Sequence, residues 1–216
     1  MARRIVVVAL GALLAAGCAD YDPGPESYIY NYAHYTKPEP ASFVHCYNYT
    51  CRTEVTTFVT PQEFADITAE LRTPSATPLE ERLRIKRAIA RWEQVVGART
   101  GTWRDKREDD PADDSEGSDF QLDCMDEAFN TSSYLMMMND AGLLHWHKIL
   151  YPHSRGVISA FGLPHHSATI QDKQTGRLYV VDSWFYDNGQ PPVIMPVEVW
   201  EKGYSPRHDG AWTGED

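Results

Sequence analysis

The stretch Gln121-Leu-Asp-Cys-Met-Asp-Glu-Ala-Phe-Asn130 places a cysteine at a helix start, and the rest of the chain can be arranged around it. Aspartate is one of the residue types that favour the N-cap position, so Asp123 puts Cys124 in the first turn of the predicted helix. The helical pattern continues to about Asp140, and Gly142 suits the C-terminal cap. The sequence therefore predicts a helix that carries a thiol at its N-terminus.

Two strands are predicted after this helix, at His165 to Gln171 and Arg177 to Trp184. The loop between them ends in Gly176, which favours an antiparallel hairpin. Asp182 lies near the end of the second strand. The order of these residues along the chain, cysteine, histidine and aspartate, supports nucleophilic catalysis by an activated thiol.

Two neighbouring histidines compete for the role of general base. Strand alternation places His165 on a polar face with Ser167 and Thr169, which should line a cleft. His166 falls on the opposite, apolar face, which should cover a core. We therefore expect His165 to act as the base and keep His166 as the alternative.

Asp182 and Gln121 are candidates for supporting roles around the same thiol. Asp182 could orient the imidazole from the far side, or simply cap its strand. The side-chain amide of Gln121 could contact a developing oxyanion together with the backbone N–H of Cys124, or be an ordinary loop residue. Cys124 also has three acidic neighbours, which raise a thiol pKa and oppose the helix terminus. A nearby imidazolium is therefore required to hold a thiolate.

Three segments together resemble the transglutaminase-like cysteine peptidase group of bacteria. They are Asp-Cys-Met-Asp-Glu-Ala at 123–128, His-His-Ser-Ala at 165–168 and Val-Asp-Ser-Trp at 181–184. The resemblance covers about residues 120–204 and departs from the family at the histidine, where the usual His-Ala pair is replaced. It implies an α+β, papain-like fold in which the helix with the thiol packs on an antiparallel sheet that bears the histidine and the aspartate.

The resemblance also implies a role for each residue of the proposed triad. Cys124 would be the nucleophile, His165 the general base and acid, and Asp182 the orienting carboxylate. The expected activity is hydrolysis or acyl transfer at peptide or amide bonds through a thioester, with a peptide or protein substrate. The group includes calcium-dependent periplasmic proteases, so calcium is a candidate ligand, although no cofactor is required by the chemistry.

The N-terminus has the features of an export signal. A basic start at residues 2–4 precedes a short apolar run from Ile5 to Ala16, and the segment ends in Leu-Ala-Ala-Gly-Cys18. This resembles a bacterial lipoprotein signal, in which Cys18 is lipidated; the alternatives are an ordinary cleaved signal peptide and an uncleaved anchor. We expect a signal at residues 1–18, a tether at 19–41 and one globular domain at 42–216. The domain would be anchored to the inner or outer membrane and face the periplasm, with a soluble periplasmic protein as the alternative.

The sequence around each of the remaining cysteines indicates a different role for it. Cys46 and Cys51 lie in a predicted hairpin from Phe43 to Val59, and in an oxidising compartment they most simply form a local disulfide. A metal pair is the weaker alternative, because no second cysteine pair is present. Cys124 is then the spare thiol, which in an exported protein suggests either a reactive group or a buried inert one.

Charge and composition exclude some partners. The formal net charge of −11 argues against nucleic acid, whose phosphates require a basic surface. The acidic block from Glu108 to Asp119 is a predicted loop and a candidate for calcium, although its spacing does not match the helix–loop–helix pattern. A histidine group at His145, His147 and His153 is a further candidate for a metal.

The other predicted elements are two helices and three strands. Thr60 and Thr77 each begin a helix with proline at the first position and glutamate three residues after the cap. The first should end near Arg72 and the second, which has a basic face, near Gly97. Strands are predicted at 143–151, 156–161 and, more weakly, 192–195. An enzyme of the thiol class is the leading function; an inactive binding module with the same fold is the main alternative.

Overall fold

The structure is a computed structural model, and it describes residues 24, 27, 37–109, 119–156 and 164–213. The predicted signal peptide with Cys18, most of the tether, most of the acidic loop and nearly all of the strand predicted at 156–161 lie outside the described residues.

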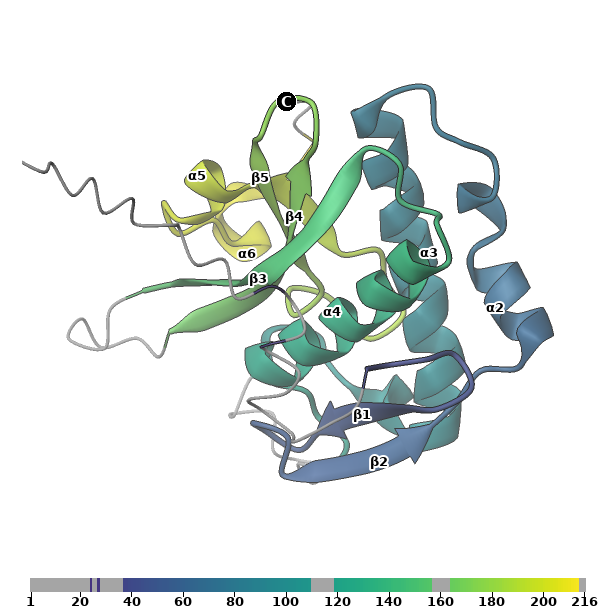
Figure 1. Cartoon of the computed structure of the whole chain (residues 1–216). Helices are drawn as coiled ribbons and strands as arrows, with labels where there is room; N and C mark the ends of the chain where they lie inside the picture. The colour runs from purple at the N-terminus through teal and green to yellow at the C-terminus, as the bar shows by residue number, and fades with distance from the viewer. Residues whose placement is uncertain (1–23, 25–26, 28–36, 110–118, 157–163, 214–216) are drawn as a thin grey trace, which may run out of the picture.

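Two antiparallel sheets and several helices make up the described part of the chain, which confirms the α+β class (Figure 1). The smaller sheet is the hairpin of β1 (Phe43–Tyr47) and β2 (Thr53–Thr57). The larger sheet has its strands in the order β3, β4, β5, β6, so each strand pairs with the next one in the chain. Its strands are β3 (His147–Arg155), β4 (His165–Asp172), β5 (Leu178–Asp182) and β6 (Val193–Pro196).

The α-helices are α2 (Pro61–Ile67), α3 (Pro78–Thr100), α4 (Cys124–Asp140), α5 (Val197–Trp200) and α6 (Pro206–Asp209). Short 3₁₀ turns lie at Ala69–Leu71, Thr102–Arg104 and Arg107–Asp109. The predicted starts of α2 and α3 are confirmed, since Thr60 and Thr77 cap the backbone N–H groups of Glu63 and Glu80. Within the described ranges, no helix is both long and apolar enough to span a membrane.

Helix α3 runs past its predicted end at Gly97 and stops at Gly101, which takes a left-handed conformation with φ of 91°. Gly97 lies inside the helix, at a position where a side chain would not fit. A Cβ atom on Gly97 would lie 2.7 Å from Asn188 Oδ1 and 3.0 Å from the backbone nitrogen of Trp103. This glycine therefore marks a close contact between α3 and the loops beside the sheet, not a helix end.

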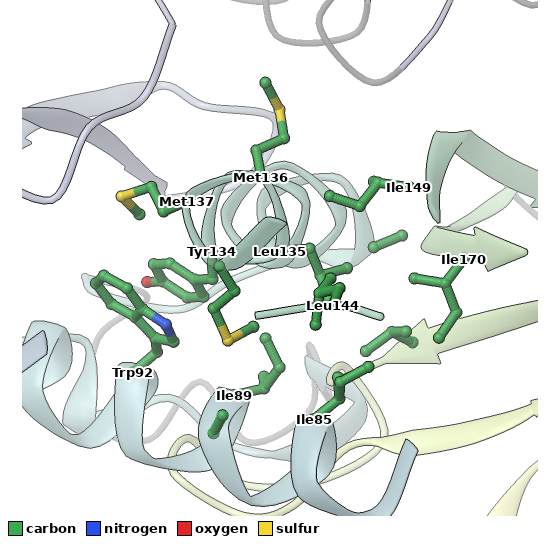
Figure 2. Close-up of a cluster of buried hydrophobic side chains, with 14 of the residues drawn as sticks. Ile85, Ile89, Trp92, Tyr134, Leu135, Met136, Met137, Leu144, Ile149 and Ile170 are labelled. Carbon is green, nitrogen blue, oxygen red and sulfur yellow. The ribbon is translucent and has the colours of Figure 1, made fainter. Parts of the chain in front are cut away.

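The main core lies between α3, α4 and one face of the four-stranded sheet (Figure 2). Trp92 of α3 stacks on Tyr134 of α4, with ring centroids 4.9 Å apart. Ile170 of β4 and Ile149 of β3 complete this core from the sheet side. The prediction that the face of β4 with His166 covers a core is confirmed, because Ala168 and Ile170 are fully buried in it.

The opposite face of the sheet is also covered, which differs from the expectation of an open cleft. Ser167 and Thr169 are each only 1% exposed. A second apolar cluster lies on this side, built from β5, β6, α5 and the segment after β5. The sequence pattern gave the correct face for His165 but missed that the C-terminal segment folds back over it.

Candidate thiol site

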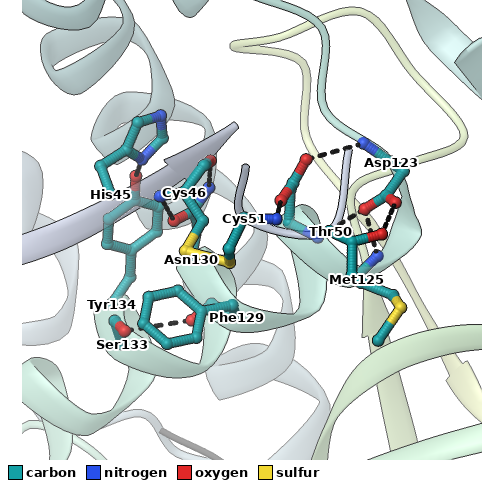
Figure 3. The surroundings of a disulfide bond; sticks show 11 residues. His45, Cys46, Thr50, Cys51, Asp123, Met125, Phe129, Asn130, Ser133 and Tyr134 are labelled. Carbon is teal, nitrogen blue, oxygen red and sulfur yellow. Dashed lines mark hydrogen bonds between the residues drawn. A yellow bond between two sulfur atoms is a disulfide. The ribbon is translucent and has the colours of Figure 1, made fainter. Parts of the chain in front are cut away.

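Cys124 is the first residue of α4, as predicted. Asp123 caps the helix (Figure 3). The Asp123 carboxylate accepts hydrogen bonds from the backbone N–H groups of Met125 and Asp126 at 3.0 and 2.9 Å. Asp126 completes a reciprocal capping box by accepting from the Asp123 N–H. This local network fixes the orientation of the first helical turn and of the thiol that it carries.

The thiol lies against the first residues of β4. Cys124 Sγ donates to the carbonyl oxygen of Pro164 at 3.8 Å. The backbone N–H of His166 also interacts with the sulfur and lowers the pKa of the thiol. The main-chain groups on both sides of His165 therefore contact the sulfur, and helix α4 and strand β4 meet at this point.

His165 and Asp182 form the predicted pair. His165 Nε2 donates to Asp182 Oδ2 at 2.8 Å, and the indole Nε1 of Trp200 donates to the same oxygen at 2.7 Å. Asp182 is 2% exposed, so its carboxylate depends on these two donors and not on water. The pair joins the first residue of β4 to the last residue of β5.

Aromatic rings enclose the His165 imidazole. The ring centroids of Trp184, Phe185 and Trp200 lie 4.7, 5.4 and 5.3 Å from that of His165. These rings restrict rotation of the imidazole and keep its hydrogen bond to Asp182 away from solvent. The arrangement holds the histidine in one orientation, which a general base requires.

His166 lies apart from this pair. Its Nδ1 shares a hydrogen bond with the hydroxyl of Ser154 at 2.7 Å, on the neighbouring strand β3. Burial lowers the pKa of His166, and the charge of His165 lowers it further. The structure therefore brings His165, and not His166, to Asp182.

The surroundings of Cys124 favour the neutral thiol. Burial raises the pKa of Cys124 to about 12, and the carboxylates of Asp123, Asp182 and Asp126 add to this, while the N–H of His166 opposes it. In the described part of the chain, no hydrogen bond joins the sulfur to an imidazole. The expected preformed ion pair is thus not present in this arrangement, and the proton remains on sulfur at neutral pH.

Gln121, the candidate oxyanion contact, is engaged with the preceding loop. Its Nε2 donates to the carbonyl of Arg104 at 3.3 Å, and its Oε1 accepts from the N–H of Lys106 at 3.0 Å. These bonds hold the segment that leads into α4.

The predicted disulfide between Cys46 and Cys51 is present (Figure 3). It closes the tip of the β1–β2 hairpin, where residues 48–51 all have positive φ values of 53–64° although none is glycine. Four consecutive left-handed residues are costly for L-amino acids. The disulfide and the contacts of this loop with α4 compensate for that conformation.

The disulfide loop is bonded to the first two turns of α4. The N–H of Cys51 donates to Asp126 Oδ1 at 2.6 Å, and Thr50 Oγ1 donates to Asp123 Oδ2 at 3.1 Å. Asn130 exchanges two hydrogen bonds with the backbone of Cys46, at 2.9 and 2.8 Å. Figure 3 shows these groups gathered on one side of the helix start. Sequence reasoning found the disulfide but not its attachment to the thiol helix.

Two buried carboxyl groups lie beneath the site and were not predicted. Glu93 of α3 and Glu127 of α4 are each 4% exposed, and burial raises the pKa of Glu93 to about 7. Burial also raises the pKa of Glu127 well above its usual range, and the charge of Glu93 adds to this. Glu93 accepts from the N–H of Gly189 at 2.7 Å. The sequence signal that could have predicted them is a glutamate on the apolar side of each predicted helix.

The histidines predicted as a metal group serve other contacts. His147 is buried and bonds to Glu81 at 2.9 Å, while His153 bonds to Glu201 at 2.8 Å at another part of the sheet. Across the described ranges, no group of three or more His, Cys, Asp or Glu side chains is arranged to hold a metal ion. Most of the acidic loop considered for calcium lies outside those ranges.

The chain matches no protein-family model, no curated protein and no solved structure at a significant level. The transglutaminase-like resemblance therefore remains a hypothesis that depends on the segments within residues 120–204.

Proposed function

We propose that this protein is a thiol hydrolase or acyltransferase that acts on peptide or amide bonds, with a transglutaminase-like, papain-like arrangement of Cys124, His165 and Asp182. The observation that carries the proposal is the position of the Cys124 sulfur against residues 164–166, the segment that presents the His165–Asp182 pair. Three residues distant in sequence thus lie at one junction of helix and sheet.

In the proposed acylation step, the thiol leaves the carbonyl of Pro164 and turns toward His165. Nε2 of His165 is used by Asp182, so Nδ1 is the ring nitrogen that takes the proton. The sulfur attacks the carbonyl carbon of the substrate, and the oxyanion is stabilised by the N–H of Cys124 and the amide of Gln121. The imidazolium then gives its proton to the leaving amine, which leaves a thioester on Cys124.

In the second step, water or an amine attacks the thioester while Nδ1 of His165 removes its proton. The proton returns to the sulfur as the thioester breaks, which restores the neutral thiol. Asp182 and Trp200 keep the imidazole in the required tautomer throughout. A thiol that is neutral in the resting protein is compatible with these two reaction steps, because the base is needed only when the substrate is bound.

The proposal is tested by labelling the full chain with a peptide-based electrophile that reacts with thiols. We expect the wild type to be labelled at Cys124 faster than a free thiol, Cys124→Ala to be unlabelled, and His165→Ala to be slowed by about 10²-fold or more. His166→Ala is the matched control and should react like the wild type. Equal rates for the wild type and the His165 variant would disprove the proposal.

The alternative is a binding module that has the same fold without turnover. The raised pKa of Cys124 and the neutral contacts of its sulfur favour this reading. It predicts slow labelling that does not depend on His165, and unchanged peptide binding in Cys124→Ala. The labelling comparison described above separates the two functions.

We further propose that the protein is exported and held at the envelope membrane through a lipid on Cys18, where it meets peptide or protein substrates. The basic and apolar composition of residues 2–17 supports this localisation. Mass measurement of the mature N-terminus, in wild type and Cys18→Ala, tests it. Calcium dependence is tested by repeating the labelling with and without a chelator.

A further inference from the structure

A short segment, residues 104–108, lies between two parts of the candidate site, and we call it the bridging segment. On one side it bonds to the residues that lead into α4, two or three positions before Cys124. On the other side it bonds to the loop that follows Asp182 at the end of β5. The bridging segment therefore connects the thiol side of the proposed triad with its aspartate side.

The bonds on the thiol side hold the main chain just before α4. The N–H of Leu122 donates to Asp105 Oδ1 at 2.7 Å. Leu122 and Asp105 are both 2% exposed, so this bond is shielded from water. A buried N–H that loses its acceptor is costly, because water cannot replace the lost partner. Asp105 thus fixes the main chain two residues before the thiol.

The tip of the β1–β2 hairpin holds the same lead-in. The N–H of Asn48 donates to the carbonyl of Gln121 at 2.8 Å, and Asn48 Oδ1 accepts from the N–H of Phe120 at 2.7 Å. Each of residues 120–123 therefore bonds to the hairpin tip or to the bridging segment. The start of α4 cannot shift without breaking several of these bonds, so the lead-in sets the position of Cys124.

The bonds on the aspartate side hold the loop that encloses His165. The N–H of Glu108 donates to the carbonyl of Trp184 at 2.8 Å. The carbonyl of Asp105 accepts from the N–H of Asn188 at 3.3 Å. Trp184 is one of the rings packed around the His165 imidazole, 4.7 Å from it between centroids. The bridging segment therefore also supports the wall of the histidine site.

Asp105 and Lys106 each bond to both sides, but their bonds differ in burial. Lys106 bonds to the side chain of Gln121 at 3.0 Å and to the carboxylate of Asp187 at 3.2 Å, and both bonds are exposed. Exposed ion pairs contribute little. Asp105 is buried and bonds to the main-chain N–H groups of Leu122 and Asn188. Asp105 is therefore the residue of this segment on which the alignment of the two sides most depends.

We propose that Asp105 is a positioning residue that sets the place of Cys124 relative to the His165–Asp182 pair. Its carboxyl group fixes the lead-in of the thiol, and its carbonyl bonds to the loop after Asp182. A displacement of about 1 Å between reacting groups can slow a reaction about 10²-fold. The inference depends on the proposed thiol chemistry, because it names a residue that aligns the groups of that same site.

The test measures labelling of the full chain by a peptide vinyl sulfone at saturating concentration, so that the rate reports alignment and not binding. Asp105→Ala removes the acceptor of the Leu122 N–H, whereas Asp105→Asn keeps an oxygen at that place. We expect Asp105→Ala to be labelled about tenfold more slowly than the wild type. Asp105→Asn should be labelled at a rate close to that of the wild type. Equal slowing by the two variants would overturn the proposal.

Asp172→Ala is the matched control for a loss of stability alone. The Asp172 carboxyl is also buried and accepts from the N–H groups of Gln174 and Thr175 at 2.7 and 3.1 Å. It lies at the last residue of β4, whereas His165 is the first. Asp172→Ala should lower the free energy of unfolding and leave the labelling rate unchanged. Equal slowing by Asp172→Ala and Asp105→Ala would show a merely structural role and overturn the proposal.

A double-mutant cycle with His165→Ala tests whether Asp105 acts through the histidine. We expect Asp105→Ala to cause little further slowing once His165 is absent. A full, independent slowing in that background would overturn this proposal while the proposed function stands. Labelling of His165→Ala at the wild-type rate would instead refute the proposed function, and this inference with it. If Asp105→Ala does not fold, Asp105→Ser replaces it in every comparison.

Discussion

A single oxygen, Oδ2 of Asp182, accepts hydrogen bonds from both His165 and Trp200. Trp200 therefore has two roles, as a core aromatic and as a donor that holds the carboxylate in place. Hydrogen bonds to a charged group contribute more than bonds between neutral groups, about 1.5–3 kcal/mol. Loss of this donor should affect the orientation of the imidazole as well as stability.

We predict that Trp200→Phe slows labelling of Cys124 by about tenfold and lowers the free energy of unfolding by about 2 kcal/mol. The substitution keeps an aromatic ring but removes the N–H. Trp184→Phe is the matched control, because Trp184 contacts the ring of His165 without a hydrogen bond to Asp182. The labelling rate and urea denaturation are the measurements, and equal effects of the two variants would contradict the prediction.

The hairpin of β1 and β2 acts on the site through its tip. The disulfide loop bonds to Asp123, the N-cap of α4, and to Asp126 and Asn130 in its first two turns. An element more than seventy residues earlier in the chain thus fixes the start of the helix that carries the thiol. The energy needed for its left-handed residues is offset by these bonds and by the cross-link.

We predict that the double variant Cys46→Ala/Cys51→Ala lowers the free energy of unfolding by about 2 kcal/mol, the loop-closure value for a ring of this size. Treating the wild type with a dithiol reductant should give the same decrease. Cys124→Ala serves as the control, since its thiol is not in the cross-link. Unchanged denaturation curves after verified reduction would refute the prediction.

At the scale of the molecule, acidic groups accumulate where α3, α4 and the sheet meet. Burial raises the pKa of Glu93 to about 7. An acid with a raised pKa in the folded state stabilises the fold below its unfolded pKa, near 4.5, and this contribution is lost as pH rises toward 7. The protein should therefore lose stability over that interval.

We predict that Glu93→Gln removes the part of this pH dependence that comes from Glu93, while the buried Glu127 keeps its own part. Glutamine keeps the acceptor for the N–H of Gly189 but has no proton to lose. The difference in unfolding free energy between variant and wild type should change by about 3 kcal/mol between pH 4.5 and 8, in favour of the variant at the higher pH. Chemical denaturation at a series of pH values measures it, and a constant difference would contradict the prediction.

Local rules predicted much of this architecture. Threonine caps placed the starts of α2 and α3, Asp123 placed α4, and strand alternation put His165 on the face of Asp182. The predictions that failed depended on contacts between residues that are far apart in the sequence. Gly97 has the local signal of a helix end but is required by contact with Asn188, and Ser167 is buried by a segment that follows it in the chain. The hydrogen bond from the Trp200 indole to Asp182 was missed for the same reason, because it forms only when the C-terminal segment folds back over the sheet.

Two main-chain groups beside the start of β4 interact with the sulfur of Cys124, the carbonyl of Pro164 and the N–H of His166. Every amino acid supplies a carbonyl, and every one except proline supplies an N–H. Position 166 can therefore accept almost any substitution without changing the contact, and only proline there is forbidden by it. Chains with very different residues around the histidine can hold the thiol in the same way, so similarity of side chains is a poor guide to which proteins share this arrangement.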